Sequence, residues 1–203
     1  MAAPDPRLLK AFGETQPVLE NRLATGVTLC MEKLKAFVET HREESIEDLS
    51  KQLSIEFAHL FRGIRKGRPP PCESVYTEEG TLYGKATVPV AREYQRFGLA
   101  MAGTYAKEPS NHIAVELFCM SHLASLEPQA WSLGEKVEAQ ELLNLVEQFL
   151  EKYILSWIQQ LCQNIREWDR TGFYEAAADL METWLRLDHK HITASSPHHN
   201  DPT

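Results

Sequence analysis

The fold class is decided by residues 141–168, which read ELLNLVEQFLEKYILSWIQQLCQNIREW. Apolar residues recur in this stretch at steps of three and four, the spacing that places them on one face of a helix. We predict a helical region from about residue 135 to residue 168, with a break near Tyr153. Its buried side carries Leu142, Leu145, Val146, Phe149, Tyr153, Ile154, Trp157, Ile158, Leu161 and Ile165.

Helical spacing also dominates the rest of the chain. It predicts helices over residues 23–38, over 85–102 and from Pro109 to about residue 126, followed by a loop that contains Pro128 and Gly134. Ser45 and Asp48 have the spacing of a capping box, so we expect a helix that begins there and stops at Gly63. Thr171 can cap a last helix. The only short strand candidate, residues 87–90, contains a proline that weakens it. We therefore predict an all-α fold, a single globular multi-helix domain over residues 1–190, with a polar, disordered tail over residues 191–203.

One segment, Gly63–Gly84, breaks this pattern. It contains three consecutive prolines at residues 69–71, and neither helical nor alternating periodicity crosses it. A connection of this length inside a compact domain is uncommon and is usually functional or disordered. Because it carries the aromatic residues Tyr76 and Tyr83, we predict one long ordered loop lying over the core. The basic run over residues 65–68 lacks the frame of a phosphate-binding loop; it could contact an anion or a nucleotide, although a solvated loop is favoured.

Charge and cysteine content exclude several classes of function. The formal net charge is −8 and the pI is near 5.5, so phosphate backbones and anionic lipid are repelled and we expect no nucleic-acid partner. The four cysteines form no closely spaced pair, which is typical of reduced cytosolic thiols. No apolar run is long enough to span a bilayer, and the N-terminus lacks the features of a secretory signal. We predict a cytoplasmic protein without stable membrane insertion.

The most informative stretch is EPSNHIAVE, residues 108–116. Proline is tolerated in the first turn of a helix, so a helix should begin near Pro109, with Asn111 and His112 in its first turn and Glu116 one turn beyond His112. Glu108 then lies at the positive end of the helix dipole. The stretch is either a polar cluster that binds a basic or amide-rich ligand, or a capping arrangement with one surface ion pair; the residues alone favour the second interpretation.

The sequence contains no recognisable catalytic site. It has no GxSxG turn, no activated cysteine context and no Gly-rich phosphate loop. His112 and Glu116 supply two metal ligands at most, with His59 and His122 as remote candidates, whereas a catalytic zinc site needs three. Four histidines, His189, His191, His198 and His199, gather near the end of the chain, where a solvated tail is favoured over a specific site. We expect no enzyme activity, no cofactor and no metal.

Two segments in sequence order resemble one known family. The first comprises residues 57–61, Gly63, Pro69–Pro71, residues 73–76 and residues 83–84; the second is the EPSNHIAVE stretch. Together they resemble the signatures of the TorD/DmsD-type redox-enzyme maturation chaperones, which are related to the NarJ group. Trp157 and Phe173-Tyr174 resemble the C-terminal pattern of that family, and the resemblance spans roughly residues 53–187. Three residues depart from it. Asn111 stands where the family usually has an aspartate, and Cys72 and Tyr76 stand where one member type has tryptophans.

The resemblance implies an all-α chaperone in the maturation of a molybdoenzyme, a class of enzyme used in anaerobic respiration. Such a chaperone binds the twin-arginine leader peptide and the apo form of a molybdopterin-dependent oxidoreductase catalytic subunit, assists cofactor insertion and delays export. It implies a monomer or a homodimer. Carried onto this chain, it gives the peptide-binding candidates Leu60, Phe61, Pro71, Cys72, Ser74, Tyr76, Glu108, Pro109, Asn111 and His112.

A mechanism follows from these candidates. Guanidinium groups pair well with carboxylates, so Glu108, and also Glu73, Glu78 or Glu79, are expected to receive the arginines of the leader. The apolar part of the leader would then lie in a groove where the long loop meets the helix that begins near Pro109, close to Leu60, Phe61 and Tyr76. Two alternatives stay open: a helical metal-dependent enzyme that uses His112, Glu108 and Glu116, and a generic helical protein-interaction adaptor.

Overall fold

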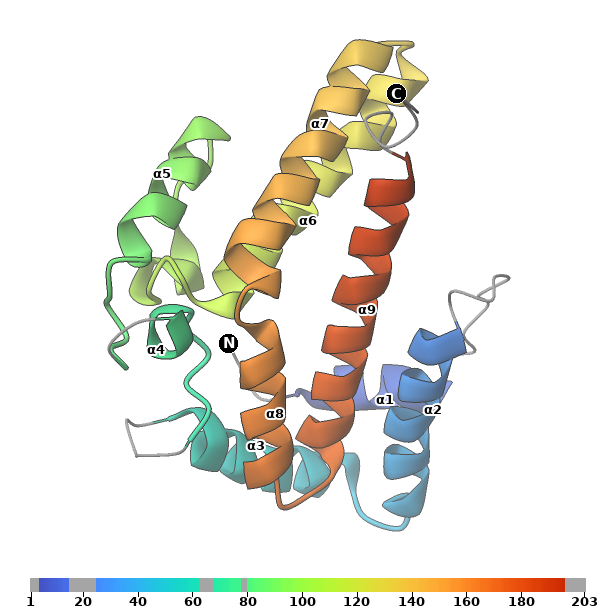
Figure 1. Ribbon diagram of the computed structural model, residues 1–203. Coiled ribbons are helices and arrows are strands. Elements are labelled where there is room, and N and C mark those ends of the chain that lie inside the picture. The colour runs from blue at the N-terminus through green and yellow to red at the C-terminus, as the bar shows by residue number, and fades with distance from the viewer. Residues whose placement is uncertain (1–3, 15–24, 63–67, 78–79, 196–203) are drawn as a thin grey trace. The chain divides into compact units, whose positions relative to one another are not determined.

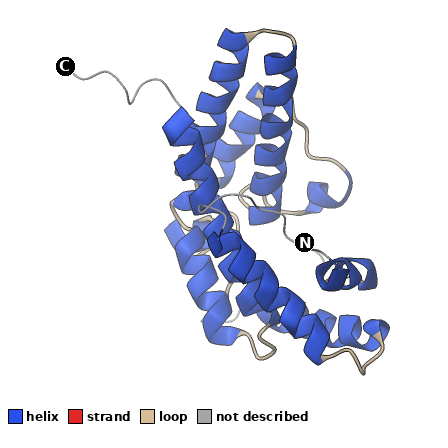
Figure 2. Cartoon of the chain, turned by 90° about the vertical axis from the view of Figure 1, so that its right-hand side faces the viewer, coloured by secondary structure: helices blue, strands red, loops and turns tan. Residues whose placement is uncertain are grey.

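The computed structural model describes residues 4–14, 25–62, 68–77 and 80–195, and over these ranges it is helical (Figures 1 and 2). The described residues contain no strand, only an isolated bridge between Cys72 and His112. The predicted all-α class is confirmed. None of the helices in the described part is long and apolar enough to cross a membrane. The elements are α1 (Pro6–Glu14), α2 (Thr25–Thr40), α3 (Ile46–Phe61), α4 (Ser74–Thr77), α5 (Thr87–Arg96), η2 (Gly103–Lys107), α6 (Ile113–Ser132), α7 (Lys136–Phe149), η3 (Leu150–Leu155), α8 (Ile158–Trp168) and α9 (Phe173–Ser195).

The chain divides into two compact units, of which the first comprises residues 1–70 and 159–187. In this unit α1 packs against α2 and α3. The start of α3 agrees with the predicted cap: the Asp48 amide donates to the Ser45 hydroxyl oxygen at 3.1 Å. The Asp48 carboxylate accepts a hydrogen bond from the same Ser45 hydroxyl. In a full capping box it would accept instead from the backbone amide of Ser45. A buried carboxylate, Glu56, receives the side chain and the backbone amide of Arg170.

The last helix, α9, has a double cap. Thr171 accepts from the amide of Phe173 as predicted, and Asp169 accepts from the amide of Glu175. Gly172 permits the tight turn between α8 and α9 because its φ is +81°.

The second unit comprises residues 71–158 and 188–203, and its main feature is the pair α6 and α7. A turn at Gly134, with φ of +78°, joins the two helices, which run side by side (Figure 1). The helix α6 continues to Ser132, so the predicted loop at Pro128 is wrong. Ala124 and Pro128 are both exposed. The carbonyl that loses its amide partner can therefore bond to water, and the helix tolerates the proline.

The long helical region after residue 135 breaks near Tyr153, as predicted. The break is a π-helical turn, η3, followed by α8. Trp157 is almost fully buried after this break, and its indole N–H donates to the carbonyl of Tyr153 at 2.6 Å. Residues 87–90, the strand candidate, begin α5.

The predicted tail requires one correction. The helix α9 runs past His191 to Ser195, because Ile192 is buried and the Thr193 hydroxyl donates to Glu147 at 2.9 Å. Residues 196–203, including His198 and His199, lie outside the described residues, as do residues 63–67 of the basic run and Glu78 and Glu79. All four cysteines are buried free thiols.

Candidate functional site

The proline-rich loop and the start of α6 meet in the second unit. Cys72 and His112 face each other as an antiparallel bridge. The Glu73 amide donates to the Asn111 carbonyl at 2.9 Å, and a second bond of 2.9 Å joins the amide of residue 113 to the carbonyl of residue 71. We call residues 71–74 together with 108–116 the polar joint. Two segments far apart in the sequence are therefore held together by their backbones, as the sequence led us to expect.

The helix begins later than predicted. Its first residue is Ile113, and His112 is the N-cap, with its Nδ1 accepting from the Ala114 amide at 3.1 Å. Asn111 precedes the helix because its carbonyl is bound by the loop. Burial lowers the pKa of His112 to about 4, although the nearby Glu108 acts in the opposite direction. His112 is therefore neutral near pH 7, which agrees with an Nδ1 that accepts a hydrogen bond.

Two of the predicted peptide-binding residues hold the joint together. The Asn111 amide nitrogen donates to the Ser74 hydroxyl at 2.7 Å, and that hydroxyl donates to the carbonyl of Thr81 at 2.7 Å. Ser74 and Asn111 are 0% exposed. Pro71, Cys72 and Pro109 are also buried. Direct contact between a peptide and these five residues would require the joint to open, so in this structure they shape the site from beneath.

Glu116 lies at the centre of the second unit. Its side chain is fully buried, and neither carboxylate oxygen has a hydrogen-bond partner among the described residues. Burial raises the pKa of Glu116 well above its usual value, and the nearby Glu73 raises it further. The side chain of Trp157 acts in the opposite direction, but its indole N–H donates to the carbonyl of Tyr153. A buried carboxyl group with this environment is held in its neutral form. Burial also raises the pKa of the Cys72 thiol to about 12, with a smaller contribution from Glu116. The joint therefore offers no reactive thiol.

Tyr76 is half-buried and stacks on Trp157. The ring centroids are 5.3 Å apart and the rings are inclined by 23°. Trp157 was predicted to be a core residue of the long helical region, but its role beneath the loop was missed. A tryptophan on a buried helix face, together with a tyrosine in an otherwise irregular loop, is the only sequence signal that pointed to this contact.

Glu108 forms the exposed edge of the joint. Its side chain is 33% exposed, and its Oε2 lies 3.8 Å from the Nε2 of His112. Because His112 is neutral near pH 7, it does not cancel the negative charge of Glu108. With one third of its side chain exposed, the Glu108 carboxylate lies where a cationic ligand can reach it. Glu73, by contrast, is only 8% exposed.

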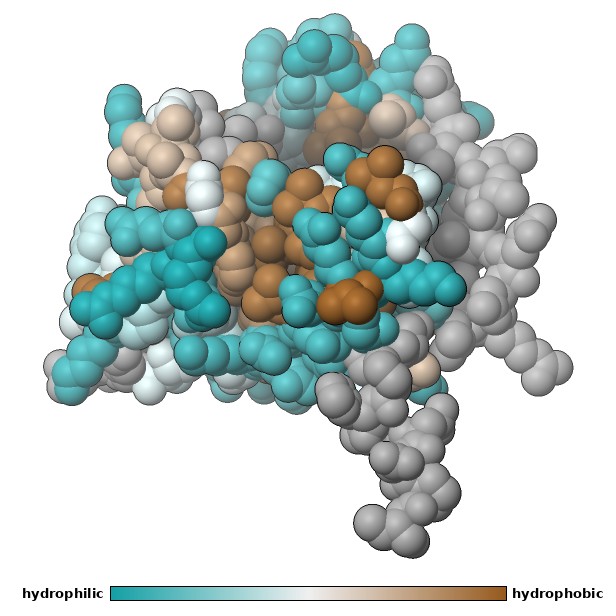
Figure 3. Space-filling view, turned by 90° about the horizontal axis from the view of Figure 1, so that it is seen from above, coloured by the Kyte–Doolittle hydropathy of each residue, from teal (hydrophilic) through white to brown (hydrophobic). Residues whose placement is uncertain are grey.

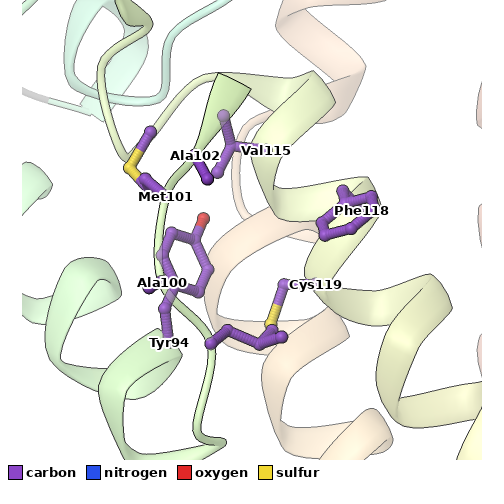
Figure 4. A pocket seen from close by; sticks show the side chains of 8 residues that line it. Tyr94, Ala100, Met101, Ala102, Val115, Phe118 and Cys119 are labelled. Atoms are coloured by element: carbon purple, nitrogen blue, oxygen red, sulfur yellow. The ribbon is translucent and has the colours of Figure 1, made fainter. Parts of the chain in front are cut away.

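An apolar pocket of about 120 Å³ lies beside the joint (Figure 4). The Tyr94 hydroxyl donates to the Ser110 carbonyl at 2.7 Å, and the Ser110 hydroxyl donates to the Met101 sulfur at 3.5 Å, so the pocket wall is fixed to the EPSNHIAVE stretch. No sequence pattern indicated this pocket. Its walls come from α5, from the linker after Gly98 and from α6; the lining residues are Tyr94, Leu99, Ala100, Met101, Ala102, Val115, Phe118 and Cys119.

Apolar surface is also exposed outside the pocket. Figure 3 shows hydrophobic residues gathered between hydrophilic ones on one face of the molecule. In the second unit, Val88 lies outside the pocket and is 55% exposed, and Phe118, which lines the pocket, is itself 51% exposed. Exposed apolar groups beside a carboxylate suit a ligand that is both cationic and apolar.

The remaining predicted site residues, Leu60 and Phe61, belong to α3 in the first unit. Leu60 is buried, and the Phe61 ring contacts Phe57 and Tyr174 with centroids 5.0 and 5.9 Å apart. Both are explained by packing within their own unit. The described site consists of the joint, Tyr76, Glu108 and the pocket.

The alternative metal site at the helix start finds no support. Among the described residues, His112, Glu108 and Glu116 do not gather as a set of three ligands. Glu116 points into the core, away from solvent.

Fold and site together define an all-helical protein whose described residues form a partly exposed surface with a carboxylate and an apolar pocket. The family of the nitrate reductase delta subunit matches residues 20–163. Several curated relatives carry the name chaperone protein TorD. The protein from Aliivibrio fischeri is 30% identical over 171 residues, which is 84% of this chain and 75% of the relative. The protein from Photobacterium profundum is 32% identical over 143 residues, 70% of this chain and 64% of the relative. The protein from Vibrio cholerae O1 El Tor is 26% identical over 157 residues, 77% and 70% of the two chains. No solved structure shows a significant match.

The chain belongs to the nitrate reductase delta subunit family, and within it to the TorD-type maturation chaperones. The predicted family and the predicted role in molybdoenzyme maturation are confirmed. The match begins at residue 20, earlier than the motifs alone indicated. Because the relatives are named chaperones, neither the metal-dependent enzyme nor the generic adaptor is favoured.

Proposed function

We propose that this chain binds, in the cytoplasm and without catalysing a reaction, the twin-arginine leader peptide and the apo form of a molybdopterin-dependent oxidoreductase catalytic subunit. It assists cofactor insertion and delays export until that step is complete. The observation that supports the proposal most directly is the joint itself, because its exposed edge carries a carboxylate beside an apolar pocket.

The chemical groups of the leader and those of the site follow the same order, a charged part and then an apolar part. A twin-arginine leader has two guanidinium groups followed by an apolar run. A guanidinium can form two parallel hydrogen bonds with a carboxylate such as that of Glu108. The apolar run then places side chains in the pocket between Met101 and Phe118, rather than in the groove near Leu60 and Phe61 that the sequence suggested.

The buried residues keep this edge in position. Ser74 and Asn111 fix the loop to the helix start, and His112 caps α6 while it leaves the charge of Glu108 in place. Asn111 stands where relatives usually have an aspartate. Since Asn111 is buried, this difference changes the interior of the joint and not the charge that the leader meets.

Affinity need only be moderate for reversible holding. Burial of apolar area contributes about 25 cal/mol per Å², and ordering a flexible leader subtracts from this gain. Two or three buried leucine side chains contribute roughly 3–9 kcal/mol. A dissociation constant on the order of micromolar corresponds to about 8 kcal/mol of net binding, so the contacts of the arginines are needed as well.

The test begins with co-purification of the untagged protein from its native host and identification of the attached polypeptide. Calorimetry with the leader of that polypeptide should show binding that weakens at least tenfold when both arginines are changed to alanine. Glu108→Gln should weaken it by a similar factor, whereas Glu127→Gln, a matched change elsewhere on the second unit, should leave it unchanged. An affinity indifferent to both the arginines and Glu108 would overturn the proposed dock.

A separate change tests the pocket. Phe118→Ser should weaken binding of the same leader while the far-ultraviolet circular dichroism spectrum stays unchanged. Val137→Ser is its control, since Val137 is 75% exposed and does not line the pocket. If the two variants bind equally well, the apolar run lies elsewhere.

A further inference from the structure

A second group of polar side chains lies away from the joint, where α9 passes α7 and η3. Glu147 is in the last turn of α7, Glu151 is in η3, and His189 is in the part of α9 that belongs to the second unit. One ligand atom from each of the three residues lies within 4.8 Å of the other two. The Nε2 of His189 and the Oε1 of Glu151 are 2.8 Å apart.

We propose that Glu147, Glu151 and His189 form a binding site for a divalent transition-metal cation of the zinc type. One imidazole nitrogen and two carboxylate oxygens are the ligand types that zinc takes in proteins, at bond lengths of about 2.0–2.2 Å. Ligands at that distance around a tetrahedral ion are about 3.3 Å apart, so the observed spacing requires only small side-chain rotations. Three protein ligands leave one position for water or for a group from a partner.

The local backbone favours this arrangement. Glu147 and Glu151 are four residues apart and therefore lie on the same side of the helix. The π-helical turn that includes Glu151 is rare, and such turns occur frequently at functional sites.

A neighbouring residue orients one of the three ligands. The Thr193 hydroxyl lies 2.9 Å from the Oε1 of Glu147 and 2.9 Å from the backbone carbonyl of His189, and its single hydrogen is shared between these two acceptors. Metal ligands are commonly oriented by such outer hydrogen bonds.

The consequence of binding would be mechanical. The ion would tie the last two turns of α9 to the junction of α7 and η3, which otherwise rests on the buried Ile192 and on these polar contacts. The sequence placed His189 and His191 near a solvated tail and predicted no metal. The continuation of α9 to Ser195 is what brings His189 to the two glutamates.

The test uses the full-length, tag-free protein and zinc chloride. Calorimetry should show one zinc ion bound per chain with a micromolar or lower dissociation constant, and zinc should raise the melting temperature. His189→Ala and Glu151→Gln should each weaken binding at least tenfold and abolish that rise. Cobalt substituted for zinc should give an absorption spectrum typical of four or five ligands.

Two controls separate this site from other histidines. His122→Ala, on α6, should bind zinc like the unchanged protein, and so should the double variant His198→Ala, His199→Ala. Zinc binding that survives His189→Ala, or that disappears with the double variant alone, would overturn the proposal. The proposal would also be overturned if the unchanged protein failed to bind zinc at a concentration of about 100 micromolar.

Discussion

Two buried glutamates, one in each unit, illustrate different solutions to the same physical problem. Glu56 is 3% exposed and receives three hydrogen bonds from Arg170, two from the guanidinium and one from the backbone amide. Glu116 is 0% exposed and has no hydrogen-bond partner among the described residues. An ionised carboxylate is tolerated in the interior only when it is paired, so Glu56 can keep its charge and Glu116 takes up a proton.

The difference has consequences for the two units. The first unit uses its buried carboxylate as a tie between α3 and the turn before α9. The second unit places a neutral acid beneath the joint, near Cys72 and Tyr94, and burial raises the pKa values of all three groups. Stability in the first unit should therefore depend on the ion pair, and stability in the second should depend on pH.

The largest expected effect is at Glu56. Glu56→Ala removes a buried carboxylate together with its charged hydrogen bonds, and it should lower the free energy of unfolding by about 3 kcal/mol. Glu56→Gln keeps the shape and should cost less. Urea denaturation at pH 7, followed by circular dichroism, measures both. A loss below about 1 kcal/mol for the alanine variant would mean that the tie does not stabilise the first unit.

The next effect is at Glu116 and depends on pH. Its pKa in the folded chain is raised, so between the ordinary value and the raised value the folded chain holds a proton that the unfolded chain releases. The contribution of this group is therefore fully present at low pH and is lost as pH rises, with a slope of about 1.4 kcal/mol per pH unit. The side chain of the Glu116→Gln variant cannot titrate. As pH rises, the free energy of unfolding of the variant should therefore increase, relative to that of the unchanged protein, by about 1.4 kcal/mol per pH unit.

Denaturation at pH 5, 6, 7 and 8 tests this expectation. His112 has the opposite pH dependence, because its pKa is lowered to about 4 and its contribution is lost as pH falls from about 6.5. Comparison of variant and unchanged protein at each pH removes the His112 contribution, which both share. A difference that stays constant from pH 5 to pH 8 would show that Glu116 is ionised in the folded chain.

The sequence predicted the helices of this molecule but not the contacts that its two buried glutamates make. Periodicity and caps located α2, α3 and α9 and the break near Tyr153, since these depend on neighbouring residues. The meeting of the loop with the start of α6 came from family resemblance. The pairing of Glu56 with Arg170, the burial of Glu116 and the pocket at Met101 depend on contacts between distant residues, which one sequence without partners does not specify.

The prediction of the helix start failed for a related reason. Pro109 is a good first-turn residue, and local propensity alone would begin α6 there. The loop binds the Asn111 carbonyl, and the His112 side chain supplies a better cap, so tertiary contacts move the start to Ile113. The same displacement turns the EPSNHIAVE stretch into a buried joint with one exposed carboxylate at its edge.

The smallest expected loss of stability is at an exposed ion pair, which can be compared with the buried pair at Glu56. Lys33 and Asp179 also form an ion pair in the first unit, at 2.7 Å, but the Lys33 side chain is 59% exposed and Asp179 keeps a second partner in Arg166. Exposed pairs gain little because water screens them, so Lys33→Ala should lower the free energy of unfolding by about 0.5 kcal/mol or less. The same urea titration measures it, and 1 M sodium chloride should remove what remains. If Lys33→Ala cost as much as Glu56→Ala, burial would not be what gives the Glu56 pair its strength.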